Sequence, residues 1–508
     1  MKTAHPLTVA KALPSLLVFW VFWLGLVGVV VWCLPASVWS LKPHGLFLWL
    51  GFLGLARYGW QGLHAARAYY YRFVAFPRMR RAADRLGPRY PRRLFFVIPS
   101  YNEDYAVSCR CFTALVTECA RLPSEVHVIA TVGSAEEIAS IEKIVRNCPG
   151  HEHVRVRFEL QKDGKRKAIA DALRTIATEF GPDLEQDDVI ALMDGDTALG
   201  EHVLERTLPF FALNPGLGGL TTDEHPRVFH SAFLEKYFAL KLMRRHHIMM
   251  SHSLSERVLT LTGRFSVVRA KLAVAPDFID HVENDSIHTW LHGDIRFLMG
   301  DDKSTLYALL KDGWRTIYVP DAYIVCLEDR EGSARLVSTL MMRWYGNMLR
   351  NNGRCLALGP RRVPPFIWLC LLDQRVAMWT SLAGPVSALL LSLLVSPYYG
   401  VFYLIWVVLA RVAQLSLLAA YGHRFRIGHL PMLVFEQWWG SAIKIYCQFH
   451  LDRQVWQKSR KKAEVVATQP ARFAGFESVV TAALFSSVVA GYVLLIGVWV
   501  RAIPHPWR

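Results

Sequence analysis

The sequence predicts an α/β domain with a mostly parallel sheet, inserted between apolar helices that are long enough to cross a membrane. Apolar residues make up 53% of the 508 residues and gather toward the two ends of the chain. Between those ends, short β-rich runs alternate with helical patterns, which is typical of a parallel sheet covered by helices. We therefore expect transmembrane helices at 1–60, the α/β domain at 61–330, interfacial helices at 331–377, and further transmembrane and interfacial helices at 378–508.

The first apolar run, residues 16–34, carries no charge and is long enough to cross a hydrocarbon core as a helix. A secretory signal peptide is the alternative interpretation of such a run. However, a second apolar stretch at 45–56 follows it, and then a cluster of arginines between Arg57 and Arg93. This order favours a membrane anchor over a cleaved signal.

The net charge of +16 comes from basic residues that lie beside the apolar stretches. Anionic lipids attract basic residues to the cytoplasmic side, so this placement indicates membrane lipids rather than nucleic acid as their partner. It also puts the α/β domain in the cytoplasm. Apolar stretches at 378–395, 398–421 and 479–500 then complete five spans, whereas 430–449 is flanked by two inner loops and is predicted as an interfacial helix.

Four apolar runs of the α/β domain are predicted as buried strands of the sheet: 94–98, 126–132, 154–160 and 189–193. Helical patterns follow the first and the third of them, at 106–121 and 167–180. In a sheet of this kind the functional site lies at the carboxyl ends of the strands. The residues that directly follow each strand are therefore the candidates for the site.

Asp194 and Asp196, separated by Gly195, directly follow the apolar strand at 189–193. Two carboxylates at such a position can hold a divalent metal against a nucleotide diphosphate. A solvated surface turn is the alternative for an Asp-x-Asp triplet. The strongly apolar strand before it favours a metal site.

A second acidic pair, Asp301 and Asp302, opens a helical stretch, where a carboxylate can take a proton from an attacking sugar hydroxyl. The alternative is that Asp301 caps the helix.

Lys165 and Arg166 precede another helix and offer cations to phosphate oxygens, although a solvated helix start would look the same. The nine cysteines are scattered, and we expect reduced thiols rather than a metal site.

The order of these motifs is more specific than each motif alone. The segment 99–103 after the first strand, Gly164-Lys165-Arg166 with Asp171, the Asp194 triplet, the Asp301 pair and Arg343-Trp344 occur in one fixed order. This order resembles the processive inverting glycosyltransferases of the cellulose, chitin and hyaluronan synthase kind. The resemblance covers residues 92–350 and the flanking spans, and it implies a GT-A-like fold for the cytoplasmic domain.

The resemblance also implies a role for each motif. Asp194 and Asp196 would hold Mg²⁺ or Mn²⁺, and Asp302, with Asp301 beside it, would be the catalytic base. Arg343 and Trp344 would bind the acceptor sugar, with the indole ring as a stacking platform. The residues implied in donor binding are Tyr101, Glu103, Lys165, Arg166, Asp171 and Asp194.

Further segments are similar to the alginate polymerases, the mannuronan synthases of bacterial exopolysaccharide systems. They are 218–222, 259–264, 300–304, 318–322, 343–347 and 373–376. The sequence departs from the wider family in two segments. Leu340 replaces the Gln that precedes Arg-Trp, an apolar replacement that the alginate polymerases share. Thr131 and Val132 replace an Asp pair that contacts uridine, which favours another nucleotide such as guanosine.

The sequence therefore predicts a multi-pass protein of the bacterial inner membrane that polymerises β-1,4 mannuronan from GDP-mannuronate and exports it. The alternatives are a related glucan synthase that uses UDP-glucose, a non-processive membrane glycosyltransferase, and a transporter or scaffold with a degenerate enzyme domain. Expected partners are the nucleotide-sugar donor, the growing polysaccharide, membrane lipids, a separate cyclic-di-GMP-binding subunit and periplasmic export proteins. Nucleic acid is not expected as a partner.

Overall fold

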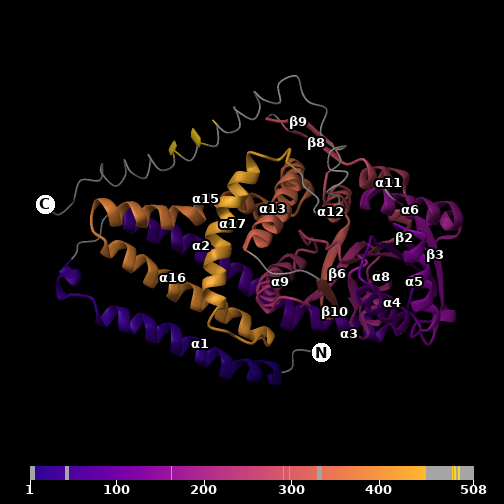
Figure 1. Ribbon diagram of the computed structural model, residues 1–508, viewed down its shortest axis with the longest axis horizontal. Helices are drawn as coiled ribbons and strands as arrows, with labels where there is room; N and C mark the ends of the chain where they lie inside the picture. The colour runs from indigo at the N-terminus through magenta and orange to yellow at the C-terminus, as the bar shows by residue number, and fades with distance from the viewer. Residues whose placement is uncertain are drawn as a thin grey trace.

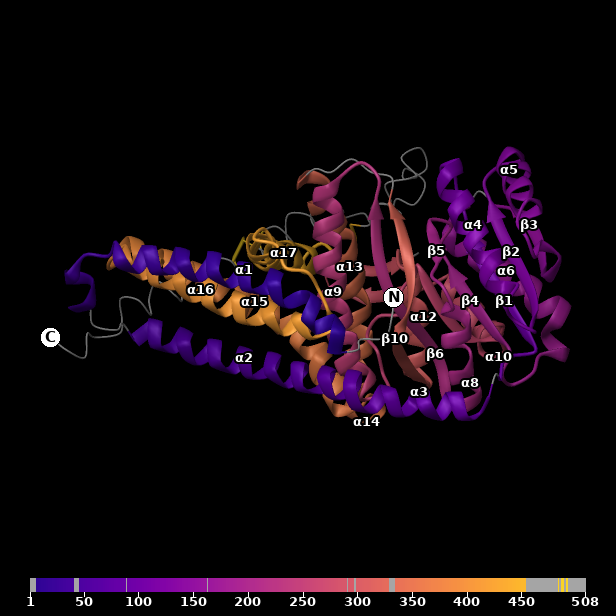
Figure 2. The same ribbon diagram turned by 90° about the horizontal axis from the view of Figure 1, so that it is seen from below.

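The computed structural model describes residues 6–40, 45–87, 89–161, 163–289, 291–296, 298–328 and 334–453, with five further positions between 483 and 491. The molecule is elongated (Figure 1), with long helices at one end and the sheet with its covering helices at the other. The second view shows the same division (Figure 2). The predicted span at 479–500 lies outside the described ranges, apart from isolated positions.

All four predicted strands are present and lie side by side. They are β1 (Arg93–Pro99), β2 (Glu125–Val132), β3 (Val154–Leu160) and β4 (Val189–Met193). Their order in the sheet is β3-β2-β1-β4, and every neighbouring pair among them is parallel. The chain moves from β1 to one side and later returns to the other side of β1. The carboxyl ends of β1 and β4 therefore flank a topological switch point, where open α/β sheets bind ligands.

The other half of the sheet contains antiparallel pairs that the strand prediction did not include. β7 (Phe265–Arg269) runs antiparallel to both β4 and β6 (Leu217–Val228). β10 (Arg315–Glu328) is parallel to β6, and the short β5 (Thr197–Leu199) is antiparallel to β10. Parallel pairs still predominate, so the predicted mostly parallel α/β fold is confirmed. A separate two-stranded sheet pairs β8 (Ser286–Thr289) with β9 (Gly293–Arg296).

Helices connect the strands as the alternating pattern predicted. The predicted helices at 106–121 and 167–180 correspond to α4 (Tyr105–Cys119) and α6 (Lys165–Phe180). The remaining helices of this domain are α3 (Phe76–Arg85), α5 (Ala135–Arg146), α7 (Val203–Thr207), α8 (Pro209–Leu213), α9 (Ala232–Ser253), α10 (Ala270–Ala273), α11 (Pro276–Glu283) and α12 (Asp301–Lys311). The central strands are buried on both faces, since Leu94 to Ile98 and Val189 to Ala191 are fully inaccessible to solvent.

Long helices form the other end of the molecule (Figures 1 and 2). They are α1 (Pro6–Trp32), α2 (Gly45–Tyr70), α15 (Pro365–Leu394), α16 (Tyr398–Ser416) and α17 (His429–Gln448). Two further helices, α13 (Ala334–Ala357) and the short α14 (Gly359–Arg362), connect the sheet domain to α15.

Three helices in the described part of the chain are long and apolar enough to cross a membrane: Ala12–Trp32, Pro365–Leu394 and Tyr398–Tyr421. The predicted span at 45–56 is helical, but it belongs to α2, whose second half is polar and which is not among these three. The helix predicted from residue 378 begins earlier, at Pro365. Helices α2 and α15 thus continue across the domain boundaries predicted after residues 60 and 377, and those boundaries stay predictions.

Candidate active site

The loops that follow β1 and β4 touch each other at the switch point. A Cβ atom added to Gly195 would lie 2.9 Å from Oγ of Ser100 and 3.1 Å from its Cα. A Cβ atom so close to the Ser100 side chain would force one of the two loops to shift, so glycine allows the loops to meet as closely as they do. The contact brings the Asp194 triplet beside the segment 99–103, as expected for two strands whose carboxyl ends share one edge of the sheet.

Glu137 of α5 holds the loop that follows β1. Its carboxylate accepts hydrogen bonds from Oγ of Ser100 at 2.8 Å and from the backbone N–H of Gly133 at 3.1 Å. The ring of Tyr101 lies directly over Gly133, and 48% of Tyr101 is exposed to solvent. The exposed ring of Tyr101 is therefore available to stack on a planar ligand group. The role of Glu137 was not predicted from the sequence, because Ser100 lies 37 residues away along the chain.

Lys165, the first residue of α6, bridges the two acidic motifs. Its Nζ lies 2.7 Å from Oδ1 of Asp194 and 2.9 Å from Oδ2 of Asp301. Asp301 is the first residue of α12, and the capping position belongs to Gly300, which has a φ of 126°. The alternative that Asp301 caps this helix is therefore wrong. Three predicted site residues from separate segments thus meet at one ammonium group.

The charges of this triad shift one another's pKa. Burial alone would lower the pKa of Lys165, but the carboxylates of Asp194 and Asp301 outweigh burial and raise it. Burial raises the pKa of Asp194 to about 6, and its neighbours Asp196 and Asp301 add to this effect, whereas Lys165 opposes it. Lys165 also outweighs burial at Asp301 and lowers its pKa. The site thus holds more negative than positive charge and favours a further cation.

Asp196 is the carboxylate best suited to such a cation. Its Oδ1 is buried and has no hydrogen-bond partner among the described residues. A buried carboxylate oxygen without a partner is costly, and a divalent metal ion would satisfy it. Oxygen ligands from carboxylates are the kind that Mg²⁺ and Mn²⁺ prefer. The residues present therefore fit the predicted metal ion.

Asp302 lies beside the triad, across a gap left by Gly263. A Cβ atom added to Gly263 would lie 3.4 Å from Nζ of Lys165, 3.7 Å from Cβ of Asp302 and 3.8 Å from Oδ2 of Asp301. Lys303 lies 3.5 Å from the carboxylate of Asp302 on the other side. The missing side chain of Gly263 leaves room at the point where the cation and the two acids converge. Gly263 lies in the segment 259–264 that is similar to the alginate polymerases, but this role could not be predicted from the sequence.

Arg166 and Asp171 lie on α6 near this site but have other partners. Arg166 donates hydrogen bonds to the carbonyls of Val282 and Leu298 and to Oγ of Ser304. Asp171 forms ion pairs at 2.9 Å with both Lys167 and Arg174. The donor-binding roles of Arg166 and Asp171 stay predictions. The contacts of Arg166 show that it braces the loop before α12.

Asp285 contacts both α12 and α13, and its role was not predicted from the sequence. Its buried carboxylate accepts hydrogen bonds from Oγ of Ser304 and, at 2.6 Å, from the guanidinium of Arg354. Burial would raise the pKa of Asp285, but Arg354 outweighs it and lowers the pKa. Ser304 lies on α12 and Arg354 on α13, so Asp285 ties these two helices together. Asp285 lies between α11 and β8 and belongs to no recognisable sequence motif, so this role could not be predicted.

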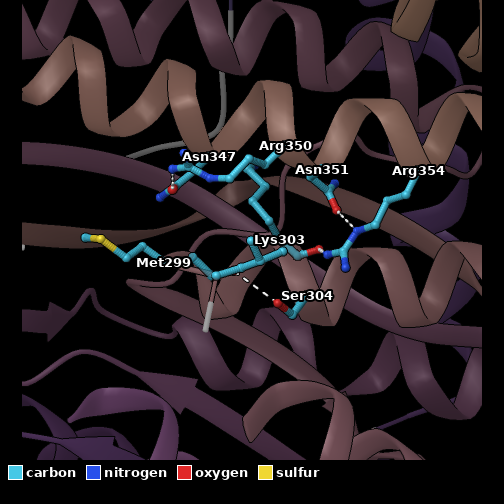
Figure 3. A pocket seen from close by; sticks show the side chains of 9 residues that line it. Met299, Lys303, Ser304, Asn347, Arg350, Asn351 and Arg354 are labelled. Carbon is cyan, nitrogen blue, oxygen red and sulfur yellow. Dashed lines mark hydrogen bonds between the residues drawn. The ribbon is translucent and has the colours of Figure 1, made fainter. Parts of the chain in front are cut away.

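A narrow cavity separates α12 from α13 (Figure 3). Lys303 and Ser304 face Asn347, Asn351 and Arg354 across it. The other residues that line the cavity are Leu298, Met299, Gly300 and Arg350. Its lining residues Gly300 and Lys303 flank the acidic pair that opens α12, so the cavity lies next to that pair.

Trp344, the predicted acceptor platform, lies on α13 one turn before Asn347. A Cβ atom added to Gly300 would lie 3.1 Å from Nδ2 of Asn347, so this face of α13 touches the start of α12. Nζ of Lys241 lies 4.2 Å from the centre of the Trp344 ring, which is a cation–π contact. Arg343, next to Trp344, is half-buried. The acceptor-binding roles of Arg343 and Trp344 stay predictions, but the fold brings their helix to the acidic site.

Comparison with known proteins identifies the class to which this fold and site belong. A family model described as "Glycosyltransferase like family 2" matches residues 91–347. Two curated relatives match most of the chain, as described below. The chain therefore belongs to glycosyltransferase family 2, and the three helices of membrane-spanning length in its described part make it a membrane-associated glycosyltransferase.

The relatives are both named "Glycosyltransferase alg8". The one from Pseudomonas syringae pv. tomato is 34% identical over 447 residues, which are 87% of this chain and 90% of the relative. The one from Azotobacter vinelandii is 33% identical over 450 residues, with the same coverage. These relatives confirm the resemblance to the alginate polymerases. A solved structure, the mannosyltransferase PcManGT from Pyrobaculum calidifontis in complex with GDP-Man and Mn²⁺, aligns with a TM-score of 0.45 at 14% identity over 76% of this chain and 98% of its own.

Proposed function

We propose that this protein is a processive, inverting polymerase that makes β-1,4 mannuronan from GDP-mannuronate at the cytoplasmic face of the bacterial inner membrane. The observation that carries the proposal is the meeting of Asp194 and Asp301 at Lys165, next to Asp302. In a family 2 chain related to alg8 glycosyltransferases, this arrangement can hold a sugar nucleotide and remove a proton from an acceptor. The α/β domain would lie in the cytoplasm, with the helices at the other end of the molecule crossing the membrane.

On the donor side, the acidic triplet and Lys165 would hold the diphosphate. Asp194 and Asp196 would bind Mg²⁺ or Mn²⁺, which when bound neutralises the charge that develops on the leaving diphosphate. When the donor enters, Lys165 would exchange its contact with Asp194 for phosphate oxygens and stay paired with Asp301. Tyr101, exposed beside Gly133, would stack on the nucleotide base, with Glu103 near it. Thr131 and Val132 end β2, and they offer no carboxylate to a uracil, which supports guanosine as the nucleoside.

The chemical step would be a direct displacement at the anomeric carbon. Asp302 would accept the proton from the acceptor 4-hydroxyl as its oxygen forms the new bond to C1, while the bond from C1 to the diphosphate oxygen breaks. Lys165 would keep the adjacent Asp301 charged and in place. Because the nucleophile attacks from the face opposite the diphosphate, the product has inverted configuration.

On the acceptor side, a cluster of aromatic rings and cations supports an anionic polymer. Nζ of Lys241 is buried and has no hydrogen-bond partner among the described residues, although Glu436 lies 3.6 Å away. It lies over the ring of Trp344 and 5.1 Å from the ring centre of Tyr345, and Lys444 lies 4.5 Å from that same ring centre. A uronate carboxylate could pair with the ammonium of Lys241, whereas a neutral glucan would leave Lys241 with only its ion pair to Glu436 at 3.6 Å. This contrast favours GDP-mannuronate over UDP-glucose.

The test is donor competition in inverted membrane vesicles that contain the full chain. We expect labelled sugar from GDP-mannuronate to enter a long polymer and UDP-glucose neither to be incorporated nor to compete. Incorporation from UDP-glucose into a β-glucan would instead establish the related glucan synthase. Product length separates processive from single-sugar transfer, and the absence of any transfer or donor hydrolysis by purified protein would favour a scaffold.

The partners implied by the family stay part of this proposal. A separate cyclic-di-GMP-binding subunit would supply regulation, and periplasmic export proteins would receive the polymer. Copurification from detergent-solubilised membranes tests both, with the growing polysaccharide and membrane lipids as the other expected partners.

A further inference from the structure

A buried cluster of potential metal ligands lies away from the acidic site, at the junction between the long helices and the sheet domain. It consists of His64 on α2, His252 on α9 and Cys370 on α15. Each residue offers one ligand atom, and these atoms all lie within 4.8 Å of one another. All three side chains are at least 94% buried, with exposures of 6%, 4% and 4%. Their scattered sequence positions explain why sequence analysis expected only reduced thiols.

The hydrogen bonds of His64 orient its ring for metal binding. Its Nδ1 lies 3.0 Å from Oγ of Ser251, and its Nε2 faces Sγ of Cys370 at 3.9 Å. A ring that donates Nδ1–H to the serine carries its lone pair on Nε2, on the side of the thiol. Metal-binding histidines are held in this way, with the second ring nitrogen hydrogen-bonded to a neighbour. Trp60 packs edge-on and Phe366 packs tilted against the same ring, with ring centroids 4.9 and 5.4 Å from that of His64.

His252 supplies an independent observation that points to a ligand. Its Nδ1 is buried and has no hydrogen-bond partner among the described residues. Its ring centre lies 5.8 Å from that of His64. A buried polar nitrogen without a partner is costly to the fold unless something binds it. A metal ion bound by His252 through Nδ1 would satisfy this nitrogen.

We propose that His64, His252 and Cys370 bind a thiophilic metal ion of the Zn²⁺ class. Two imidazoles and a thiolate are a common ligand set for Zn²⁺, and ligand atoms around a tetrahedral zinc are roughly 3.6 Å apart. The observed 3.9 Å between Nε2 of His64 and Sγ of Cys370 needs little adjustment to reach this spacing. The fourth position would be taken by water, since the Ser251 hydroxyl lies on the Nδ1 side of the His64 ring.

Such an ion would join three parts of the molecule that are distant in sequence. α2 comes from the N-terminal helices, α9 from the sheet domain, and α15 is one of the helices of membrane-spanning length. Figures 1 and 2 show α2 and α15 running from the helical end toward the sheet domain. The role is therefore structural, and it is separate from the Mg²⁺ or Mn²⁺ site at Asp194 and Asp196.

The test is metal content of the full-length protein purified in detergent, stripped with chelator and re-equilibrated with Zn²⁺. We expect about one tightly held zinc per chain by mass spectrometry and at least a tenfold loss of occupancy in Cys370→Ser and His252→Gln. Cys355→Ser is the matched control, since Cys355 is also buried but lies on α13 outside the cluster, and it should keep its zinc. Zinc occupancy that is absent in the wild type, or unchanged in Cys370→Ser, would overturn the proposal.

A second measurement on the unmodified chain guards against variants that fail to fold. Cd²⁺ added to the stripped wild type should give a thiolate-to-metal absorption band in the ultraviolet and protect one cysteine from alkylation. Peptide mapping should identify that cysteine as Cys370. A band without protection of Cys370 would place the metal elsewhere and contradict the assignment. Neither readout depends on polymerase activity, so failure of this proposal is distinct from failure of the proposed function.

Discussion

Nζ of Lys165 lies 2.9 Å from Oδ2 of Asp301, so the first residue of α6 is paired with the first residue of α12. The two helices begin far apart in sequence, and both begin at the same edge of the sheet. The same ammonium group pairs with Asp194 from the loop after β4. One cation thus holds together the proposed donor-binding and base-carrying segments before any substrate arrives.

The first prediction concerns Lys165. Lys165→Met would leave Asp194 and Asp301 buried without their cation, and the pKa of Asp194, already raised to about 6, would rise further. We expect polymer synthesis to fall by about 100-fold, because a charge aimed at the leaving phosphate is lost. Lys311→Met, an exposed substitution at the end of α12, is the control in radiolabel incorporation assays. Equal rates for the two variants would exclude a role for Lys165.

The second prediction concerns the contact between Gly195 and Ser100. In Gly195→Ala the new Cβ would lie 2.9 Å from Oγ of Ser100, so the loop that carries Asp194 must shift. We expect at least a tenfold loss of activity, and partial recovery when Ser100→Gly is added, since that removes the nearest side-chain atoms. Gly181→Ala should be neutral, because no atom lies within 4 Å of a Cβ there. A double variant no better than Gly195→Ala would argue against this steric account.

The third prediction concerns the metal ion. Asp196→Asn would weaken the site at its unpartnered oxygen, so Mn²⁺ affinity measured by calorimetry should fall at least tenfold. Chelator should abolish sugar transfer by the wild type, and added Mn²⁺ or Mg²⁺ should restore it. Full transfer in the presence of excess chelator would show that the acidic triplet acts without a metal.

The fourth prediction is a pH dependence at the acceptor cluster. Burial lowers the pKa of Lys241 to about 8, with Glu436 opposing and Lys444 adding to the shift. The ammonium that would pair with a uronate is therefore present below pH 8 and lost as the pH rises through it. We expect chain elongation to decline between about pH 7 and pH 9 in the wild type.

Lys241→Met should shorten the product at pH 7 and remove that decline. The stability of the fold changes with pH in the opposite direction from elongation. It rises with pH, because the pKa of Lys241 in the folded protein lies below the ordinary 10.5. The unfolded chain then holds the extra proton between these values, so Lys241 lowers stability below pH 8 and this cost disappears as the pH rises toward 10.5. An elongation profile that is identical in the wild type and Lys241→Met would exclude Lys241 as an acceptor contact.

Elements and motifs that have a signal within a short stretch of sequence could be predicted. Buried parallel strands are continuous apolar runs, so the sequence predicted the strands at 94–98, 126–132, 154–160 and 189–193. The acids that directly follow the last of these strands could then be predicted as site residues. The antiparallel β7 could not be placed, because its partners β4 and β6 are set by tertiary pairing. Helix α15 was predicted to begin at residue 378 because its first turns carry Asp373 and Arg375, which pair with other helices in the fold.

The missed site residues share a physical reason. Glu137, Gly263 and Asp285 act through contacts that join segments distant in sequence, and none has a periodic or motif signal of its own. Conversely, Lys165 was predicted as a phosphate ligand, but its pairing with both acids could be seen only in three dimensions. The metal-ligand cluster of His64, His252 and Cys370 depends on three separate helices in the same way.

The most direct measurement is donor binding and polymer formation by Asp302→Asn, side by side with Asp312→Asn at the exposed end of the same helix. The amide cannot accept the proton of the acceptor hydroxyl, yet it leaves Lys165, Asp194 and Asp301 in place. We predict donor affinity within about twofold of the wild type and a loss of polymer synthesis of about 1,000-fold, in the range expected for a missing general base. Polymer synthesis by Asp302→Asn at the rate of Asp312→Asn would contradict the account.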